Sequence, residues 1–125
     1  MPYEPPDTAL NLHALSLSDQ ALRLDQPPSS RCLVASDRLR VVLLKLPEGV
    51  RPAHIHPYAD EVIEVVSGVV GATFADRAEQ IVQPGDLLLA MRGVRHQIRV
   101  VGPEPAVLLC IVAPNVDTPD EQVNA

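Results

Sequence analysis

The sequence predicts an all-β protein that closes into a barrel or a two-sheet jelly roll. The first observation is that thirteen prolines and six glycines break the 125-residue chain into short pieces. The second is that these pieces are rich in Val, Ile and Leu, and residues branched at Cβ favour the pleated, half-buried surface of a strand. The third is that turn signals recur between the apolar pieces, as in sandwiches and barrels. Closure is expected because it hides the edges of such a sheet.

The length and composition suit one domain with an aliphatic core. A chain of 125 residues buries roughly two-thirds of its surface on folding, which supports a single core. Apolar residues make up 46% of the sequence, but its aromatic residues are only Tyr3, Tyr58 and Phe74. We therefore expect a core of Val, Leu, Ile and Ala.

Three regions are expected along the chain. Residues 1–30 form an N-terminal arm that packs on the barrel, residues 31–114 form the barrel, and residues 115–125 form an irregular C-terminal tail. Within the arm, residues 18–24 have the pattern of one or two helical turns, with Ser18 as the N-cap.

The barrel region contains apolar segments that are each bounded by a turn signal. Gly68 separates two of these segments so closely that we place it in a hairpin turn. Before the barrel, residues 11–15 fit either a short strand or a loop. The expected strands are residues 31–35, 39–46, 60–67, 69–74, 79–82, 87–91, 97–101 and 106–113.

Charge and patterning argue against two classes of partner. The formal net charge is −6, and an acidic chain gains no counterion release from a phosphate backbone, so nucleic acid is not expected. No segment approaches the ~20 apolar residues of a membrane span, and the first residues lack the pattern of a signal peptide. We therefore expect no membrane partner and a cytoplasmic protein, with Cys32 and Cys110 as reduced thiols in the core.

Two histidines and a glutamate in the middle of the chain have a spacing that suggests a site. His54 and His56 are separated by one residue, and side chains at i and i+2 of an extended chain point to the same face. Glu61 follows after a short connection and shares a strand face with Ile63 and Val65. An unpaired carboxylate on such an apolar face is costly to bury, and a metal cation is one natural compensation.

A third histidine repeats this pattern in a later strand. His96 comes 35 residues after Glu61 and shares a face with the apolar Ile98 and Val100. Imidazoles together with a carboxylate suit Mn, Fe, Co, Ni, Cu or Zn. A single histidine in a β protein is usually an ordinary structural residue, so a metal site requires the fold to bring these side chains together, which periodicity does not show.

The first of these segments resembles the first conserved motif of the cupin family. That motif is a glycine, His-x-His, a glutamate and a second glycine, which here are Gly49, His54, His56, Glu61 and Gly68. Only four residues separate the first glycine from the first histidine, where the family usually has five.

The second segment resembles the second cupin motif. It runs from Gly85 through Gly93 to His96. Met91 stands where the family usually has proline, and Val100 where it often has asparagine. None of these departures falls on a family metal ligand, and the two motifs with their strands cover about half of the chain, roughly residues 44–101.

The resemblance to a small, single-domain cupin of bacterial type implies a fold, a metal site and an assembly. The fold is a double-stranded β-helix, a jelly-roll barrel with the metal near one mouth, and the assembly is often a homodimer. The implied ligands of one divalent transition metal (Mn, Fe, Ni, Co, Cu or Zn) are His54, His56, Glu61 and His96, and Glu61 could also act as a catalytic base if it detaches.

Several functions stay open at this point. One is a metalloenzyme, for example a dioxygenase-type oxidoreductase acting on a small organic acid or enol, because cupins with this ligand set include many dioxygenases. The alternative is a non-catalytic module that binds a metal and a small molecule. A third interpretation is a vestigial cluster without metal.

A few other residues have two interpretations. Arg92 and Arg95 could bind a carboxylate bidentately, but solvated charges in a turn are the simpler interpretation, and Arg51 has the same ambiguity. Tyr58 could line the mouth of the barrel or lie in a surface loop. His13 lies outside both motifs and is not expected to bind the metal.

Overall fold

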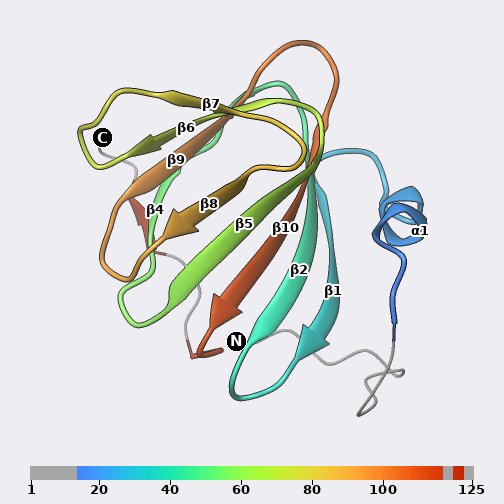
Figure 1. Ribbon diagram of the computed structural model, residues 1–125, viewed down its shortest axis with the longest axis horizontal. Helices are drawn as coiled ribbons and strands as arrows, with labels where there is room; N and C mark the ends of the chain where they lie inside the picture. The colour runs from blue at the N-terminus through green and yellow to red at the C-terminus, as the bar shows by residue number, and fades with distance from the viewer. Residues whose placement is uncertain (1–13, 117–119, 123–125) are drawn as a thin grey trace.

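The computed structural model of the chain is a β-barrel made of two facing antiparallel sheets (Figure 1), and it describes residues 14–116 and 120–122. The prediction of an all-β, double-stranded β-helix fold is confirmed. The elements are α1 (Leu17–Leu22), β1 (Ser29–Ala35), β2 (Arg40–Leu46), β3 (Gly49–Val50), β4 (Ala53–Ile55), β5 (Asp60–Ser67), β6 (Val70–Phe74), β7 (Gln80–Val82), β8 (Leu87–Ala90), β9 (His96–Val100), β10 (Ala106–Ala113) and β11 (Asp120–Gln122).

The two sheets combine strands that are distant in the sequence. Within the described residues, the first sheet has the order β1-β2-β10-β5-β8, and the second has the order β11-β4-β9-β6-β7, with β3 paired to β9. The described pairings are antiparallel, and neighbours such as β2 and β10 come from opposite halves of the chain. Side chains that lie far apart in the sequence therefore meet inside one barrel.

The core between the sheets is aliphatic, as the composition predicts. Alternate residues of each strand face inward, and the apolar members of this inward set on β2, β5, β9 and β10 are mostly Val, Ile and Leu. The residues of this interior cluster are Leu46, Ile63, Val65, Val70, Ala72, Val82, Leu88, Ile98, Val100, Ala106, Leu108 and Cys110.

A second apolar cluster lies on the outer face of the first sheet. Leu33, Leu43, Val107 and Leu109 form its buried part. The short helix α1 and the residues beside it cover this face with Leu17, Ala21 and Leu24. The first sheet therefore buries both of its faces at β2 and β10, which explains their nearly continuous apolar sequences.

The structure corrects the predicted helix. It begins two residues earlier than expected, because Ser16 and not Ser18 is the N-cap: the Ser16 hydroxyl accepts a hydrogen bond from the backbone N–H of Asp19. Serines at both positions have the same capping chemistry, so their residue type alone does not distinguish them. Of the segment 11–15, residues 11–13 lie outside the described residues.

Gly68 does not form the predicted hairpin. β5 and β6 belong to different sheets, so the chain crosses from one layer to the other at this glycine. Its φ of +85° is a conformation that favours glycine, and a Cβ would lie 2.8 Å from Cα of Ala106. The short spacing between the strands reflects a tight crossover and not a two-residue turn.

Three short strands were not predicted. β3 and β4 are two and three residues long and pair with β9, and β11 pairs with β4 through Asp120 and Ile55. The segment 115–125 is therefore not irregular throughout, since its backbone at Asp120–Gln122 satisfies hydrogen bonds along the edge of β4. Such short pieces have too few residues to show a period.

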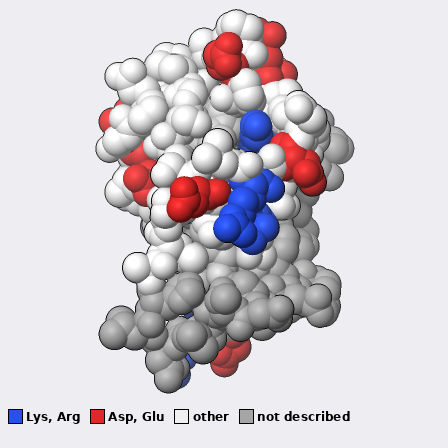
Figure 2. Space-filling model, turned by 90° about the vertical axis from the view of Figure 1, so that its right-hand side faces the viewer, with Lys and Arg blue, Asp and Glu red and all other residues white. Residues whose placement is uncertain are grey.

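The described surface carries charges of both signs. On the face that Figure 2 shows, basic side chains are flanked by acidic side chains, which does not resemble the basic stripe of a nucleic-acid-binding protein. No helix in the described part of the chain has the length and apolarity that crossing a membrane requires.

Candidate metal centre

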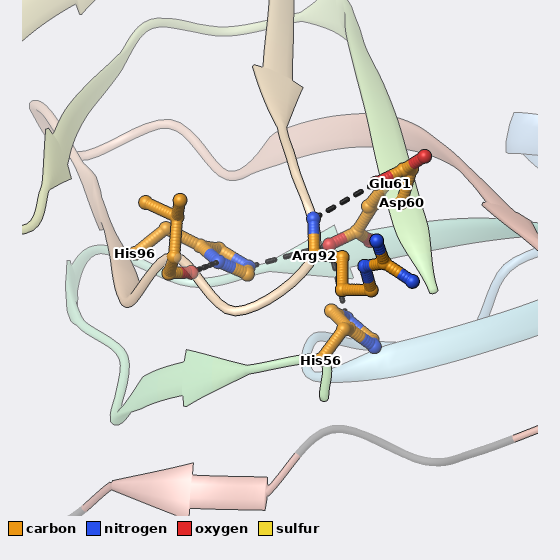
Figure 3. A network of polar contacts seen from close by, with 6 residues as sticks. His56, Asp60, Glu61, Arg92 and His96 are labelled. Atoms are coloured by element: carbon orange, nitrogen blue, oxygen red, sulfur yellow. Dashed lines mark hydrogen bonds and ion pairs between the residues drawn. The ribbon is translucent and has the colours of Figure 1, made fainter. Parts of the chain in front are cut away.

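Glu61 is the buried acidic side chain at the centre of the site. It is the second residue of β5, and it shares the inward face with Ile63 and Val65, as predicted. Its side chain is 9% exposed, so its carboxylate has lost most of its water. The imidazoles of His56 and His96 compensate: their Nε2 atoms lie 3.2 and 3.3 Å from Oε1 of Glu61 (Figure 3).

The two histidines reach Glu61 from neighbouring parts of the second sheet. His56 directly follows β4, and His96 opens β9 on the same inward face as Ile98 and Val100. Both side chains are buried, and their rings stack with centroids 5.8 Å apart and planes 12° apart. The carbonyl oxygen of Val94 lies 3.3 Å from Nδ1 of His96 and holds the ring from the side opposite to Nε2, the atom that faces the carboxylate of Glu61.

Backbone contacts hold the two motifs together. The amide of Gly93, in the turn before β9, donates to the carbonyl of His56 at 2.9 Å. The amide of Arg92 in the same turn donates to Oδ1 of Asp60 at 2.8 Å (Figure 3). Because these bonds fix the turn against residues 56 and 60, the positions of His56, Glu61 and His96 are coupled through the backbone.

The three side chains form a group that could hold a metal ion. His56, Glu61 and His96 each offer a donor atom, these atoms lie within 4.8 Å of one another, and all three residues are buried. Two imidazole nitrogens and a carboxylate oxygen are donors that divalent transition metals accept. The residues present therefore fit a metal ion.

His54 lies beside this group without belonging to it. It is on β4, directly opposite His96 of β9 in the strand register, and the two ring centroids are 6.0 Å apart. His54 lines the same cavity as the other three residues. The structure thus places all four predicted residues at one end of the barrel, and brings the donor atoms of three of them within reach of one another.

The histidines determine the ionisation of the glutamate. Burial raises the pKa of Glu61, but hydrogen bonds from His56 and His96, together with their charges, outweigh burial and lower this pKa from 4.5 to about 2. Glu61 is therefore an anion at neutral pH, the form that binds a cation. Burial, followed by the charge and hydrogen bonding of Glu61, raises the pKa of the neighbouring Cys110 thiol.

A cavity of about 350 Å³ opens onto the group. This volume is within the range of pockets for small organic molecules, roughly 300–1,000 Å³. Its walls are mostly aliphatic side chains of β2, β5, β9 and β10, with polar side chains among them. The lining residues are Pro28, Ser29, Ser30, Arg40, Val42, Leu44, Leu46, Arg51, His54, His56, Glu61, Ile63, His96, Ile98, Leu108, Cys110 and Val112.

The structure also places the residues whose roles were open. Arg51 lines the cavity, whereas Arg92 and Arg95 do not. Tyr58 is 68% exposed, which fits a surface loop. His13 lies outside the described residues.

One charged residue of the cavity was not predicted by the sequence analysis. Arg40 is only 4% exposed and lines the cavity from the first position of β2. An arginine at the start of a strand is ordinarily taken as a solvated end. The alternation of Arg40 with Val42, Leu44 and Leu46 was the signal that could have identified it as inward.

The cysteines are both free, as predicted. Cys110 is buried in the interior cluster, whereas Cys32 is only partly buried. Both pair in register with Val42, one from each side, which separates their Cα atoms by about 10 Å and rules out a disulfide between them.

The barrel and its buried His-Glu-His group define a class of protein, the double-stranded β-helix proteins with a potential metal centre. Residues 42–112, more than half of the chain, match the cupin domain family, and the chain belongs to this family. No curated protein sequence matches the chain.

Solved structures show the same fold at low sequence identity. One is a conserved protein with a double-stranded β-helix domain from Klebsiella pneumoniae. It is 21% identical to this chain with a TM-score of 0.74, and the match covers 88% of this chain and 97% of the Klebsiella chain. The protein BH2720 from Bacillus halodurans is 24% identical with the same TM-score, and the match covers 88% of this chain and 86% of BH2720. The DMSP lyase DddQ from Ruegeria pomeroyi is 24% identical, with a TM-score of 0.66, covering 74% of this chain and 50% of its own.

Proposed function

We propose that this cupin binds one divalent transition metal ion, Mn, Fe, Ni, Co, Cu or Zn, and acts on a small organic acid or enol held beside the metal. The observation that carries the proposal is the buried group of three donor atoms on His56, Glu61 and His96. A buried carboxylate and two imidazoles on otherwise apolar strand faces are costly to desolvate, and a shared cation would offset that cost.

His54 is proposed as the fourth ligand. It lines the cavity next to the other three residues and stands opposite His96 in the strand register. His54 is partly buried, whereas His56 and His96 are buried. A modest rotation of its side chain toward Glu61 would complete a set of three imidazoles and one carboxylate.

The cavity supports a ligand-binding and not a purely structural role. When bound, the metal would polarise an oxygen-bearing ligand as a Lewis acid and, if redox-active, support dioxygenase-type chemistry. The aliphatic walls at Val42, Leu44 and Ile63 would exclude water from that ligand. Glu61 would remain a ligand, or accept a proton at Oε1 if it detached from the ion.

The experiment is metal analysis and titration of the purified protein and its variants. We expect one metal per chain in the wild type, and a loss of most of the affinity, at least about tenfold, in His56→Ala, Glu61→Ala and His96→Ala. Glu64→Ala, on the opposite face of β5, and His13→Ala, outside both motifs, are the matched controls and should keep the wild-type affinity. Equal losses in the controls, or no metal in the wild type, would refute the site.

The family also leads us to expect a cytoplasmic homodimer. Leu87 and Leu89 support an association surface, because these large apolar side chains are each 60% exposed on the edge strand β8. Sedimentation of the purified protein measures its oligomeric state, and a monomer at micromolar concentration would contradict the expected dimer.

A further inference from the structure

Arg40 is a buried cation in the wall of the cavity. It is the first residue of β2 and stands in phase with Val42, Leu44 and Leu46, which also line the cavity. Only 4% of Arg40 is exposed. Arginines are rarely buried to this extent unless an anion or hydrogen-bond acceptors compensate for the lost water.

A polar relay positions the guanidinium. Nη1 of Arg40 donates to Oδ1 of Asn115 at 2.9 Å, and Nδ2 of Asn115 donates to the carbonyl of Ser36 at 2.8 Å. The backbone amide of Asn115 also donates to the carbonyl of Asp37 at 3.3 Å. The segment after β10 and the turn before β2 therefore both help to position the side chain of Arg40.

The strand register relates Arg40 to the candidate metal centre. Val112 of β10 pairs with Arg40 on one side and with Glu61 on the other. Arg40 and Glu61 thus stand at the same level of one sheet, about 10 Å apart between Cα atoms, and both line the cavity. The positive charge of Arg40 also acts on the thiol of Cys110, which lies on the strand between them.

We propose that Arg40 binds the carboxylate of a small organic acid whose other end reaches the metal centre, an inference that rests on the proposed function. The planar fork of a guanidinium matches a carboxylate bidentately, and this pairing is strong in a cavity with little water. The spacing selects a ligand with two oxygen-bearing ends. One end is a carboxylate on Arg40, and the other is a carboxylate or enol directed at His56, Glu61 and His96.

The test compares dicarboxylates with their monoamides on zinc-loaded protein. Succinate, glutarate and adipate vary the distance between the two ends, and each monoamide removes one charge at nearly constant shape. For the wild type we expect the best-fitting dicarboxylate to bind about 10- to 100-fold more tightly than its monoamide, as for hydrogen bonds between charged groups. Calorimetry measures both affinities.

Substitutions of single arginines then test which of them produces the preference for the dicarboxylate over its monoamide. Arg40→Gln should remove the preference for the dicarboxylate, and Arg40→Lys should restore only part of it, because an ammonium lacks the bidentate fork. Arg77→Gln, in an exposed turn away from the cavity, is the control and should keep the preference. Zinc affinity is measured for each variant with the metal alone, and circular dichroism checks that each variant is folded.

The possible outcomes separate this inference from the proposed function. Loss of the preference in Arg40→Gln with unchanged zinc affinity supports the inference. A preference that persists in Arg40→Gln, that disappears only in Arg51→Gln, or that is absent from the wild type at every chain length would overturn it. A protein that binds no zinc but keeps an Arg40-dependent preference for dicarboxylates would refute the metal centre and leave carboxylate binding by Arg40 standing.

Discussion

For individual residues, the alternation of inward and outward side chains along a strand predicted much of the candidate site. Glu61 and His96 were expected to face inward because their neighbours at i+2 and i+4 are apolar, and both side chains are buried. The same rule applies to Arg40, but it lies near the start of the predicted strand 39–46, where a charged side chain is ordinarily expected to face solvent. The distances among the three donor atoms follow from pairing between strands, which no local pattern contains.

The ionisation of Glu61 leads to a pH prediction for the metal-free protein. Its pKa is lowered from 4.5 to about 2 in the folded state, so the ionised carboxylate stabilises the fold above about pH 4.5, and this contribution is lost as the pH falls toward 2. The stability advantage of the wild type over Glu61→Gln should therefore shrink between pH 5 and pH 2, by an amount on the order of 3 kcal/mol.

Urea unfolding of both proteins at a series of pH values checks this prediction. Taking the difference between wild type and Glu61→Gln cancels the titration of the other carboxyl groups that the two proteins share. A difference that stays constant between pH 5 and pH 2, or that grows as the pH falls, would contradict the assignment of Glu61 as a histidine-paired anion.

Among the secondary-structure elements, the long strands were predicted from the sequence most accurately. The predicted bounds of β5 and β10 agree with the structure at both ends, because eight residues of alternating or continuous apolar character leave little ambiguity. β3, β4 and β11 are two or three residues long and are defined by their pairing with other strands, β3 and β4 with β9 and β11 with β4. Local sequence could not predict them for that reason.

The crossover at Gly68 gives a prediction about stability. Gly68 and Gly85 both have positive φ values, +85° and +99°, so alanine at either position should lose about 1–2 kcal/mol through backbone strain. At Gly68 the new Cβ would also meet the backbone of β10, 2.8 Å from Cα of Ala106 and 2.9 Å from the carbonyl oxygen of Pro105, whereas at Gly85 it would meet open space. Gly68→Ala should therefore lose a further 1–3 kcal/mol, roughly the penalty of overpacking.

Chemical denaturation of the two glycine variants separates strain from steric overlap. The midpoint of Gly68→Ala should fall clearly below that of Gly85→Ala, with similar slopes if both remain two-state. Equal midpoints would mean that the first strand residues of β10 move aside readily, and that the crossover needs only the backbone conformation of a glycine.

The arrangement of strands at the scale of the whole molecule could not be derived from alternation. Period-two patterns determine which face of a strand is buried, but backbone hydrogen bonds do not distinguish one neighbour from another, so the sheet order stayed undetermined. The resemblance to the cupin motifs supplied the fold class but not the pairing of each strand, and the hairpin predicted at Gly68 was wrong. Once β4, β5 and β9 meet at one end of the barrel, the side chains of His56, Glu61 and His96 converge as a consequence of the topology.

This convergence links metal binding to the stability of the entire barrel. The ligands come from both sheets, so the unfolded chain offers no comparable site, and free metal at 100 times its dissociation constant should stabilise the folded protein by about 2.7 kcal/mol at neutral pH. The stabilisation should decrease below about pH 6, because imidazoles must lose their protons to bind metal. Thermal unfolding with and without zinc, at several pH values from 5 to 8, measures the effect, with His96→Ala as the variant expected to gain little. A metal-induced rise in Tm that is flat across this pH range, or equally large in His96→Ala, would show that zinc binds elsewhere on the molecule.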